Sequence, residues 1–220
     1  LDMFGIDPVI TEATDVLGQN AGESVEEIVR AEIQAGTSVL YGTGASRGSQ
    51  SSANPITFTL VRKAVRTLMA NNAKPYTGER GGNGQGGMFM GIIHPSQWYD
   101  LVGDTTVQNA AIYSDPDKIY KMEIPTIGSV MWIVTTFAPK FAGAGSGSAD
   151  VYGALVFGQN AFGVVNCGGS GKFKSVIKPL GSGGSADPLD QRATIGWKSV
   201  QLPKLLNNNF ITRIETGVSA

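Results

Sequence analysis

Residues 44–48, GASRG, are the first part of the chain whose residue types and spacing could do chemistry. They match the G-x-S-x-G pattern, in which a serine, here Ser46, is the nucleophile of a hydrolase, with a histidine and an acid as its partners. Three glycines, the first at Gly42, also follow an apolar run that ends at Tyr41, as in a glycine turn that binds a nicotinamide cofactor. One segment therefore raises two enzyme hypotheses.

The elements expected on either side of this segment favour neither hypothesis. A dinucleotide site needs a strand before the turn and a helix directly after it. Here a long helix is expected before the turn, and residues 49–55, which end in a proline, follow it, so no helix starts where the phosphate would sit. A hydrolase elbow needs an acid and then a histidine later in the chain, and Glu79 is the only acidic residue between Ser46 and His94. We interpret residues 42–52 as a flexible exit from the long helix, and we expect no catalytic residue and no cofactor.

Cysteine and histidine are too few for other common chemistry. Cys167 is the only cysteine and His94 the only histidine, which excludes an intrachain disulfide and a Cys/His zinc site. Because His94 ends an apolar run and has no second histidine, we expect it to have a structural role at the end of a strand.

Two pairs of aspartates could in principle hold a hard cation: Asp115 with Asp117, and Asp187 with Asp190. Neither pair lies in the run of oxygen ligands that a calcium loop needs. We therefore interpret both as solvated turns and predict no metal site.

The composition points to contacts with other chains. Charged residues make up 16% of the sequence, where about 25% is usual, and the 30 glycines are about twice the usual share. Seventeen basic and 18 acidic residues give a net charge of −1 without a block of like charge, which disfavours a nucleic-acid arm or a membrane-surface patch. No apolar run is long enough for a membrane span or a signal peptide, so we expect a soluble, unexported chain.

The clearest predicted element is one long helix over residues 8–35. Asp7 can cap it, Pro8 can occupy its first position and Gly36 can end it. Its apolar stripe consists of Ile10, Ala13, Leu17, Ala21, Val25, Ile28 and Ile33.

A second helix is expected after Pro55. Its apolar stripe consists of Leu60, Val61, Ala64, Val65, Leu68 and Met69, and its opposite face carries Arg62, Lys63 and Arg66. A strand over 88–93 and a short helix from Pro95, capped by Ser96, are expected next. The rest of the chain is rich in β-branched and aromatic runs, which predict strands within residues 129–137, 150–158, 161–166, 172–178, 192–202 and 209–215.

The ordered set of motifs resembles a known family. DMFGIDPVITEATDVLGQNAGESVEEIVRAEIQAGTSVLYG at the start is followed by HPSQWYDLVGD, then by YGALVFGQNAFGVV, and near the end by DPLDQRATIGWKSVQLPKLLNNNFITRIET. This set resembles the major capsid proteins of tailed bacteriophages, specifically the N-four-like phage coat family. The resemblance covers nearly the whole chain.

The resemblance implies an α+β protein with the Hong Kong 97-type capsid fold. Residues 1–52 would hold the spine helix of a peripheral domain, 53–171 an axial domain, and 172–220 the returning β-strands of the peripheral domain. Val25 and Ile28 on the spine helix would pack against returning strands that include Ile195, Trp197 and Val200. Family members also carry an N-terminal arm and an extended loop before the spine helix, and we find no match to these parts before residue 8.

The implied function is that of a structural subunit of an icosahedral capsid and not of an enzyme. Subunits would self-assemble into hexamers and pentamers of a shell that encloses double-stranded DNA, with only weak, non-specific contact to the DNA. Decoration, scaffold and portal proteins are further implied partners, and no membrane is involved. The implied location is the virion capsid, assembled in the cytoplasm of the bacterial host.

Two alternatives stay open at this point. An encapsulin-like protein compartment shell shares the fold and would differ in its cargo. A nucleotide-cofactor-binding enzyme is the more distant alternative, because it rests only on the glycine segment discussed above.

Overall fold

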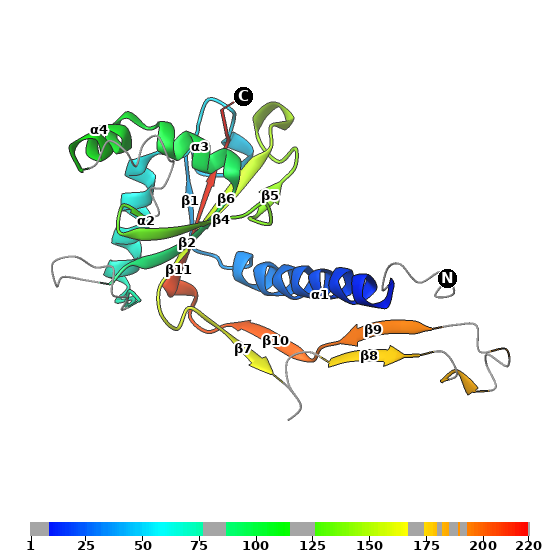
Figure 1. Ribbon diagram of the computed structural model, residues 1–220. Helices are drawn as coiled ribbons and strands as arrows, with labels where there is room; N and C mark the ends of the chain where they lie inside the picture. The colour runs from blue at the N-terminus through cyan, green and yellow to red at the C-terminus, as the bar shows by residue number, and fades with distance from the viewer. Residues whose placement is uncertain are drawn as a thin grey trace. The chain divides into compact units, whose positions relative to one another are not determined.

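The computed structural model describes residues 9–76, 87–114, 126–166, 174–179, 182–184, 189 and 193–219 (Figure 1). These residues form two compact units: residues 1–29 with 164–204, and residues 30–163 with 205–220. Several residues considered above lie outside the described part, namely Asp7, Pro8, Glu79, Asp115, Asp117, Cys167, Asp187 and Asp190.

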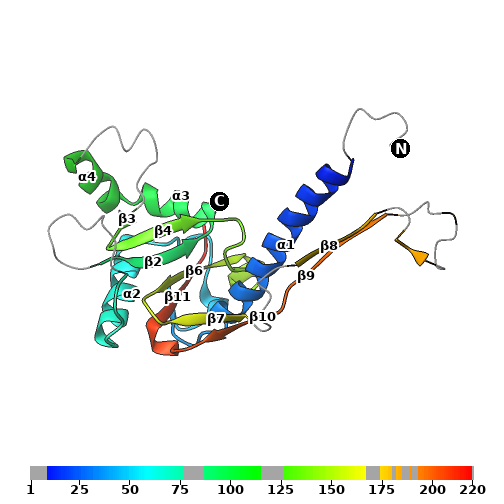
Figure 2. The same cartoon turned by 60° about the horizontal axis from the view of Figure 1, so that its bottom comes forward.

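Seven described strands form a mixed sheet in the second unit (Figure 2). The order across the sheet is β1 (Val39–Tyr41), β11 (Ile211–Thr216), β6 (Val151–Phe157), β2 (Phe89–Ile93), β4 (Val130–Val134) and β3 (Thr126–Ile127), and β5 (Lys140–Phe141) pairs with β6. β1 is parallel to β11 and β2 to β4, whereas the other pairs are antiparallel. The strands come from distant parts of the chain, so residues near both ends of the sequence lie side by side in the sheet.

Helix α2 (Phe58–Ala70) supplies much of the core. The side chains of its predicted stripe are buried, except that of Met69, which is 56% exposed. Including Met69 in the stripe was wrong, because one residue turns a helix by about 100° and moves its side chain from the core toward the basic face. The stripe joins one buried cluster with residues of the sheet that include Phe89, Ile93, Val130, Trp132, Ala154, Val156 and Ile214.

Two shorter helices follow strand β2, and the carboxylate of the residue between them caps the second of these helices and also helix α2. α3 covers Pro95–Gly103 and α4 covers Thr105–Ser114. Asp104, between them, accepts hydrogen bonds from Phe58 N at 2.9 Å and Thr106 N at 2.8 Å, at the starts of α2 and α4. Burial raises the pKa of Asp104, but these bonds outweigh burial and hold it below its usual value. Asp104 thus fixes the entry of two helices at one point.

The first unit contains most of helix α1 (Val9–Gln34) and a set of paired strands. The observed helix bounds lie within one residue of the predicted 8–35 at each end. β8 (Lys174–Lys178) and β9 (Thr194–Lys198) form an antiparallel pair, and β10 (Gln201–Leu205) pairs with β7 (Phe162–Asn166). The predicted strand over 192–202 is therefore two strands, β9 and the start of β10.

The buried side of helix α1 is the predicted one, but less of the predicted apolar stripe is buried than expected. Ala21 is buried, and Trp197 Nε1 donates a hydrogen bond to Asn20 Oδ1 at 3.2 Å, so the helix does pack beside β9. Ile28, about two turns beyond Ala21 on the same side, is 50% exposed, and Val200 is also exposed. The prediction that Val25 and Ile28 pack against Ile195, Trp197 and Val200 is therefore not confirmed for Ile28 and Val200, whose side chains are exposed in the single chain.

Candidate functional site

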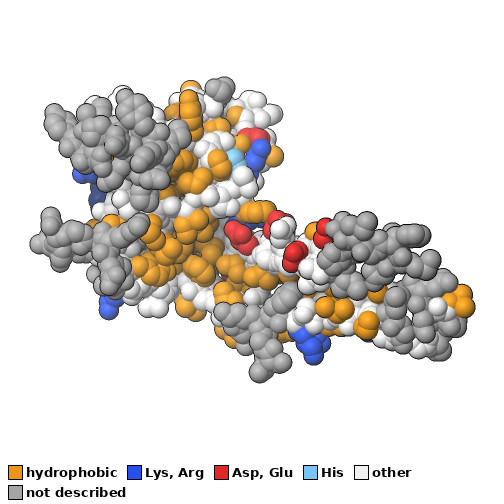
Figure 3. All heavy atoms as spheres, viewed as in Figure 1, with side chains coloured by type: hydrophobic (Ala, Val, Ile, Leu, Met, Phe, Trp, Pro, Cys, Tyr) orange, Lys and Arg blue, Asp and Glu red, His pale blue; other side chains and the backbone are white. Residues whose placement is uncertain are grey.

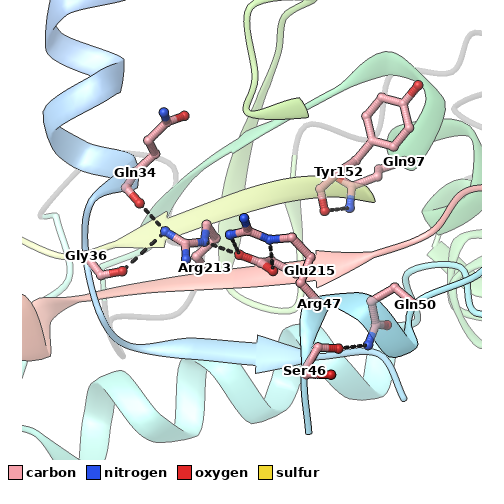
Figure 4. Close-up of polar contacts among 9 residues, drawn as sticks. All are labelled: Gln34, Gly36, Ser46, Arg47, Gln50, Gln97, Tyr152, Arg213 and Glu215. Carbon is pink, nitrogen blue, oxygen red and sulfur yellow. Dashed lines mark hydrogen bonds and ion pairs between the residues drawn. The ribbon is translucent and has the colours of Figure 1, made fainter. Parts of the chain in front are cut away.

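The glycine segment forms an ordered turn that suits neither enzyme hypothesis. Ser46 is followed by a single 3-10 turn (Arg47–Ser49) and not by an α-helix. Its carbonyl accepts hydrogen bonds from Ser49 Oγ at 2.7 Å and Gln50 Nε2 at 3.1 Å (Figure 4). Gln50 is fully buried, and its Oε1 also accepts a hydrogen bond from Thr43 N. The prediction of a flexible exit was wrong, because one buried glutamine holds the turn closed.

A buried carboxylate with two arginines lies next to this turn (Figure 4). Glu215 on β11 is 0% exposed. Arg47 donates to both of its oxygens, from Nε to Oε2 at 2.8 Å and from Nη2 to Oε1 at 2.7 Å. Arg213, two residues before Glu215 on the same strand face, donates from Nε to Oε1 at 2.6 Å. The three charges form one hydrogen-bonded group, here called the Arg–Glu–Arg group.

The Arg–Glu–Arg group also anchors the end of helix α1 within the second unit. Arg213 Nη1 donates to the carbonyl of Gln34 and to that of Gly36 at 3.2 Å, just where the helix ends (Figure 4). These carbonyls lack partners within the helix and lie at its negative end, so a cation there is favourable. The guanidinium of Arg47 lies 3.5 Å from the ring centroid of Phe141, which covers the group. The group thus joins α1, the glycine turn, β5 and β11.

The arginines determine the charge state of Glu215. Burial alone raises the pKa of the carboxyl, but the hydrogen bonds and charges of Arg47 and Arg213 outweigh burial and hold it below its ordinary value of 4.5. The hydrogen bond to Glu215 in turn raises the pKa of Arg47. The group is therefore fully charged at neutral pH.

The stability of the protein should consequently decrease as the pH is lowered through a defined range. A carboxyl whose pKa is lower in the folded protein stabilises it above the unfolded pKa, about 4.5, and loses this effect as pH falls through the folded value. Between pH 7 and pH 3 we expect the natural protein to lose more unfolding free energy than Glu215→Gln, measured by urea denaturation. Asp104, whose pKa is also lowered, is present in both proteins. An equal loss in the two would contradict this role of Glu215.

His94 has the structural role expected of it, in a different form from the predicted one. Its Nδ1 accepts a hydrogen bond from Ser96 N at 3.2 Å, so His94, not Ser96, caps α3. Its ring lies 4.6 Å from that of Tyr152. Burial, with a smaller contribution from the charge of Lys140, lowers the pKa of His94, which favours the neutral ring whose Nδ1 can accept this bond. The histidine is thus engaged in a helix cap.

Within the described residues, no group of three or more histidine, cysteine, aspartate or glutamate side chains could hold a metal ion. The same part of the chain has no helix with the length and apolar character that a membrane crossing would require.

The strands of the first unit and the residues next to them, such as Leu206 after β10, carry many exposed apolar side chains. Strand β8 is exposed at all five positions. A two-stranded pair is only marginally stable in water on its own. The exposed apolar residues on both faces of strands β7, β8 and β10, with one residue between β9 and β10, are together called the open strand surface: Val164, Val165, Val176, Ile177, Val200 and Leu202. Hydrophobic side chains are visible along this region in Figure 3.

A second apolar region lies on the sheet of the second unit. Met90 and Ile92 on β2 stand opposite Met131 and Ile133 on β4, on the face away from the buried Phe89 and Trp132. None of these four side chains is fully buried, and Ile133 is exposed. Figure 3 shows hydrophobic side chains gathered where β2 and β4 lie. Both units therefore present apolar area of the kind that marks protein contacts.

Several solved structures of similar fold are phage capsids. The capsid protein of cyanophage Pam1 superimposes with a TM-score of 0.72 at 16% identity, over 98% of this chain and 70% of its own. That of Helicobacter pylori bacteriophage KHP30 gives 0.69 at 11% identity, over 98% and 71%. That of Ralstonia phage GP4 gives 0.60 at 18% identity, over 83% and 53%. No protein-family model and no curated protein matches the sequence significantly.

At these identities the likeness establishes the fold. The chain has the α+β fold of phage major capsid proteins, and the predicted Hong Kong 97-type fold is confirmed. The chain spans about half of the GP4 protein and about 70% of the Pam1 and KHP30 proteins. The narrower resemblance to the N-four-like coat family rests on the sequence motifs.

Proposed function

We propose that this protein is a structural subunit of an icosahedral bacteriophage capsid, which self-assembles into hexamers and pentamers around double-stranded DNA. The observation that carries the proposal is the capsid fold joined to strands whose apolar side chains are uncovered in the single chain. Burial of such side chains between subunits would release about 25 cal/mol for each Å² removed from water. No catalytic residue is needed for this function.

The finer parts of the proposal concern the place of each part in a shell. The spine helix and returning strands, residues 1–52 and 172–220, would form the peripheral domain, and residues 53–171 the axial domain. Decoration, scaffold and portal proteins would be further partners, and assembly would take place in the cytoplasm of the bacterial host before the subunit enters the virion. The near-neutral charge of −1 supports weak contact with DNA, because binding DNA through its phosphates needs many cations.

The direct test is the assembly state of the purified protein. We expect sedimentation velocity and negative-stain microscopy to show capsomers or shells instead of a monomer of 23.0 kDa. Nuclease-resistant DNA inside particles from infected cells would separate a genome container from an encapsulin-like shell with protein cargo. A strictly monomeric protein at high concentration would contradict the proposal.

A further inference from the structure

One face of helix α1 is acidic along most of its length. Glu12, Asp15, Glu23 and Glu26 are all exposed. At 100° per residue they fall within an arc of about 80°, on the side of the helix opposite the buried Ala21. These four residues are here called the acidic face, and they extend over about 21 Å at 1.5 Å per residue.

Helix α2, in the other unit, carries the opposite charge. Arg62, Lys63 and Arg66 are exposed on the side away from the core, and they are here called the basic face. Of these three, Arg62 lies over the ring of Phe58 at 5.9 Å. Among the described residues, no ion pair joins a member of either face to another side chain. The chain thus presents two charged faces of opposite sign.

Each face also has features that solvent alone does not explain. Val16, beside the acidic face, is 66% exposed, and Met69, beside the basic face, is 56% exposed. Gly18 and Gly22 adjoin the acidic face, and, within the part of the chain that the structure describes, no atom beyond the helix's own backbone and the adjacent residues lies within 4 Å of the position where a Cβ would be. Each glycine costs the helix roughly 1 kcal/mol relative to alanine, a cost that a closely approaching neighbour would explain.

We propose that the acidic face of α1 binds the basic face of α2 of a second copy of this chain. The inference rests on the proposed capsid function and adds which surfaces meet. A single contact between the acidic face of one copy and the basic face of the next is heterologous, and heterologous contacts can close into rings such as capsomers. A nucleic acid is the less favourable partner for the basic face, since three cations are fewer than the roughly six to ten phosphate contacts of strong DNA binding.

Reciprocal charge reversal tests the contact. One variant is Lys63→Glu with Arg66→Glu, and the other is Glu23→Lys with Glu26→Lys. Arg62 is left unchanged because of its contact with Phe58. Each variant alone places like charges opposite each other, so the concentration needed for assembly should rise about tenfold or more, measured by sedimentation velocity at low salt. All four positions are exposed, so thermal unfolding should match that of the natural protein.

Mixing the variants provides the decisive observation. In the mixture each variant supplies the face that complements the other, so assembly should return toward the natural concentration. A chain with all four substitutions should also assemble, and it keeps the natural net charge of −1. If the mixture needs as high a concentration for assembly as each variant alone, the proposal is overturned. In that case the two faces do not pair between different copies of the chain.

The remaining outcomes separate the inference from the proposed function. If the natural protein assembles and both reversed variants assemble equally well, the inference fails while the capsid function stands. If the natural protein does not assemble, the proposed function fails first. If the Lys63→Glu, Arg66→Glu variant assembles normally but its particles lose DNA, the basic face serves the nucleic acid and the proposal is wrong.

Discussion

Replacing Arg213 with methionine is expected to lower the free energy of unfolding by roughly 3–5 kcal/mol, a large part of the stability of a typical domain. The substitution keeps much of the aliphatic volume but removes the donor to Glu215 Oε1 and to the carbonyls of Gln34 and Gly36. Glu215 stays buried with only one arginine beside it, and the end of α1 loses its cation. Chemical denaturation followed by circular dichroism measures the change.

Arg47 provides the matched control for this prediction. Its side chain is 35% exposed, so solvent can replace part of what it gives to Glu215. Arg47→Met should therefore cost clearly less than Arg213→Met, although both remove an arginine from the same carboxylate. Equal costs would mean that the anchoring of α1 through Arg213 adds nothing, and a cost below about 1 kcal/mol for Arg213→Met would contradict the role given to the whole group.

The two long helices could be predicted from the sequence because their signals are local. The apolar positions of α1 and α2 repeat at the helical period over many residues, and Gly36 lies two residues beyond the last residue of α1. What periodicity does not give is the extent of the surface that covers a helix. Ile28 has the right phase and is still half exposed.

The Arg–Glu–Arg group could not be predicted from the sequence as a whole. Arg47 and Glu215 are 168 residues apart, and only the pairing of β1 with β11 brings the two regions together. Two of its three members did leave a signal, since Arg213 and Glu215 are two residues apart in a predicted strand and must share a face. A charged pair on a strand whose other residues are uncharged and mostly buried indicates a buried partner, because buried charges are rarely unpaired.

The N-terminal cap of α3 shows a second reason why a prediction from the sequence can fail. Serine is the usual cap, and Ser96 stands one residue after Pro95, so the pattern favoured it. Proline prefers the first helical position, however, and this places the cap one residue before it, at His94. Pro203 lies within β10, just beyond the predicted strand that ended at residue 202, and the missing N–H of a proline is tolerated in a strand at the edge of a sheet.

The second large effect concerns assembly. Leu202 on β10 belongs to the open strand surface and is 58% exposed, whereas Leu155 on β6 is 0% exposed. Leu202→Asp should leave the subunit folded, with a loss of at most about 1 kcal/mol, because a carboxylate at this position stays in water. It should nevertheless prevent capsomer or shell formation at concentrations where the natural protein assembles, since burial at a contact would leave the charge unpaired.

Leu155→Asp is the matched substitution in the core. There the carboxylate would be buried in the centre of the sheet beside β2 and β11, and the loss of several kcal/mol should prevent folding. Circular dichroism and sedimentation velocity on the two variants separate the roles of the two leucines. A Leu202→Asp variant that assembles normally would show that the open strand surface is simply solvated. In that case the exposed apolar strands would no longer support the capsid proposal, which would then rest on the fold alone.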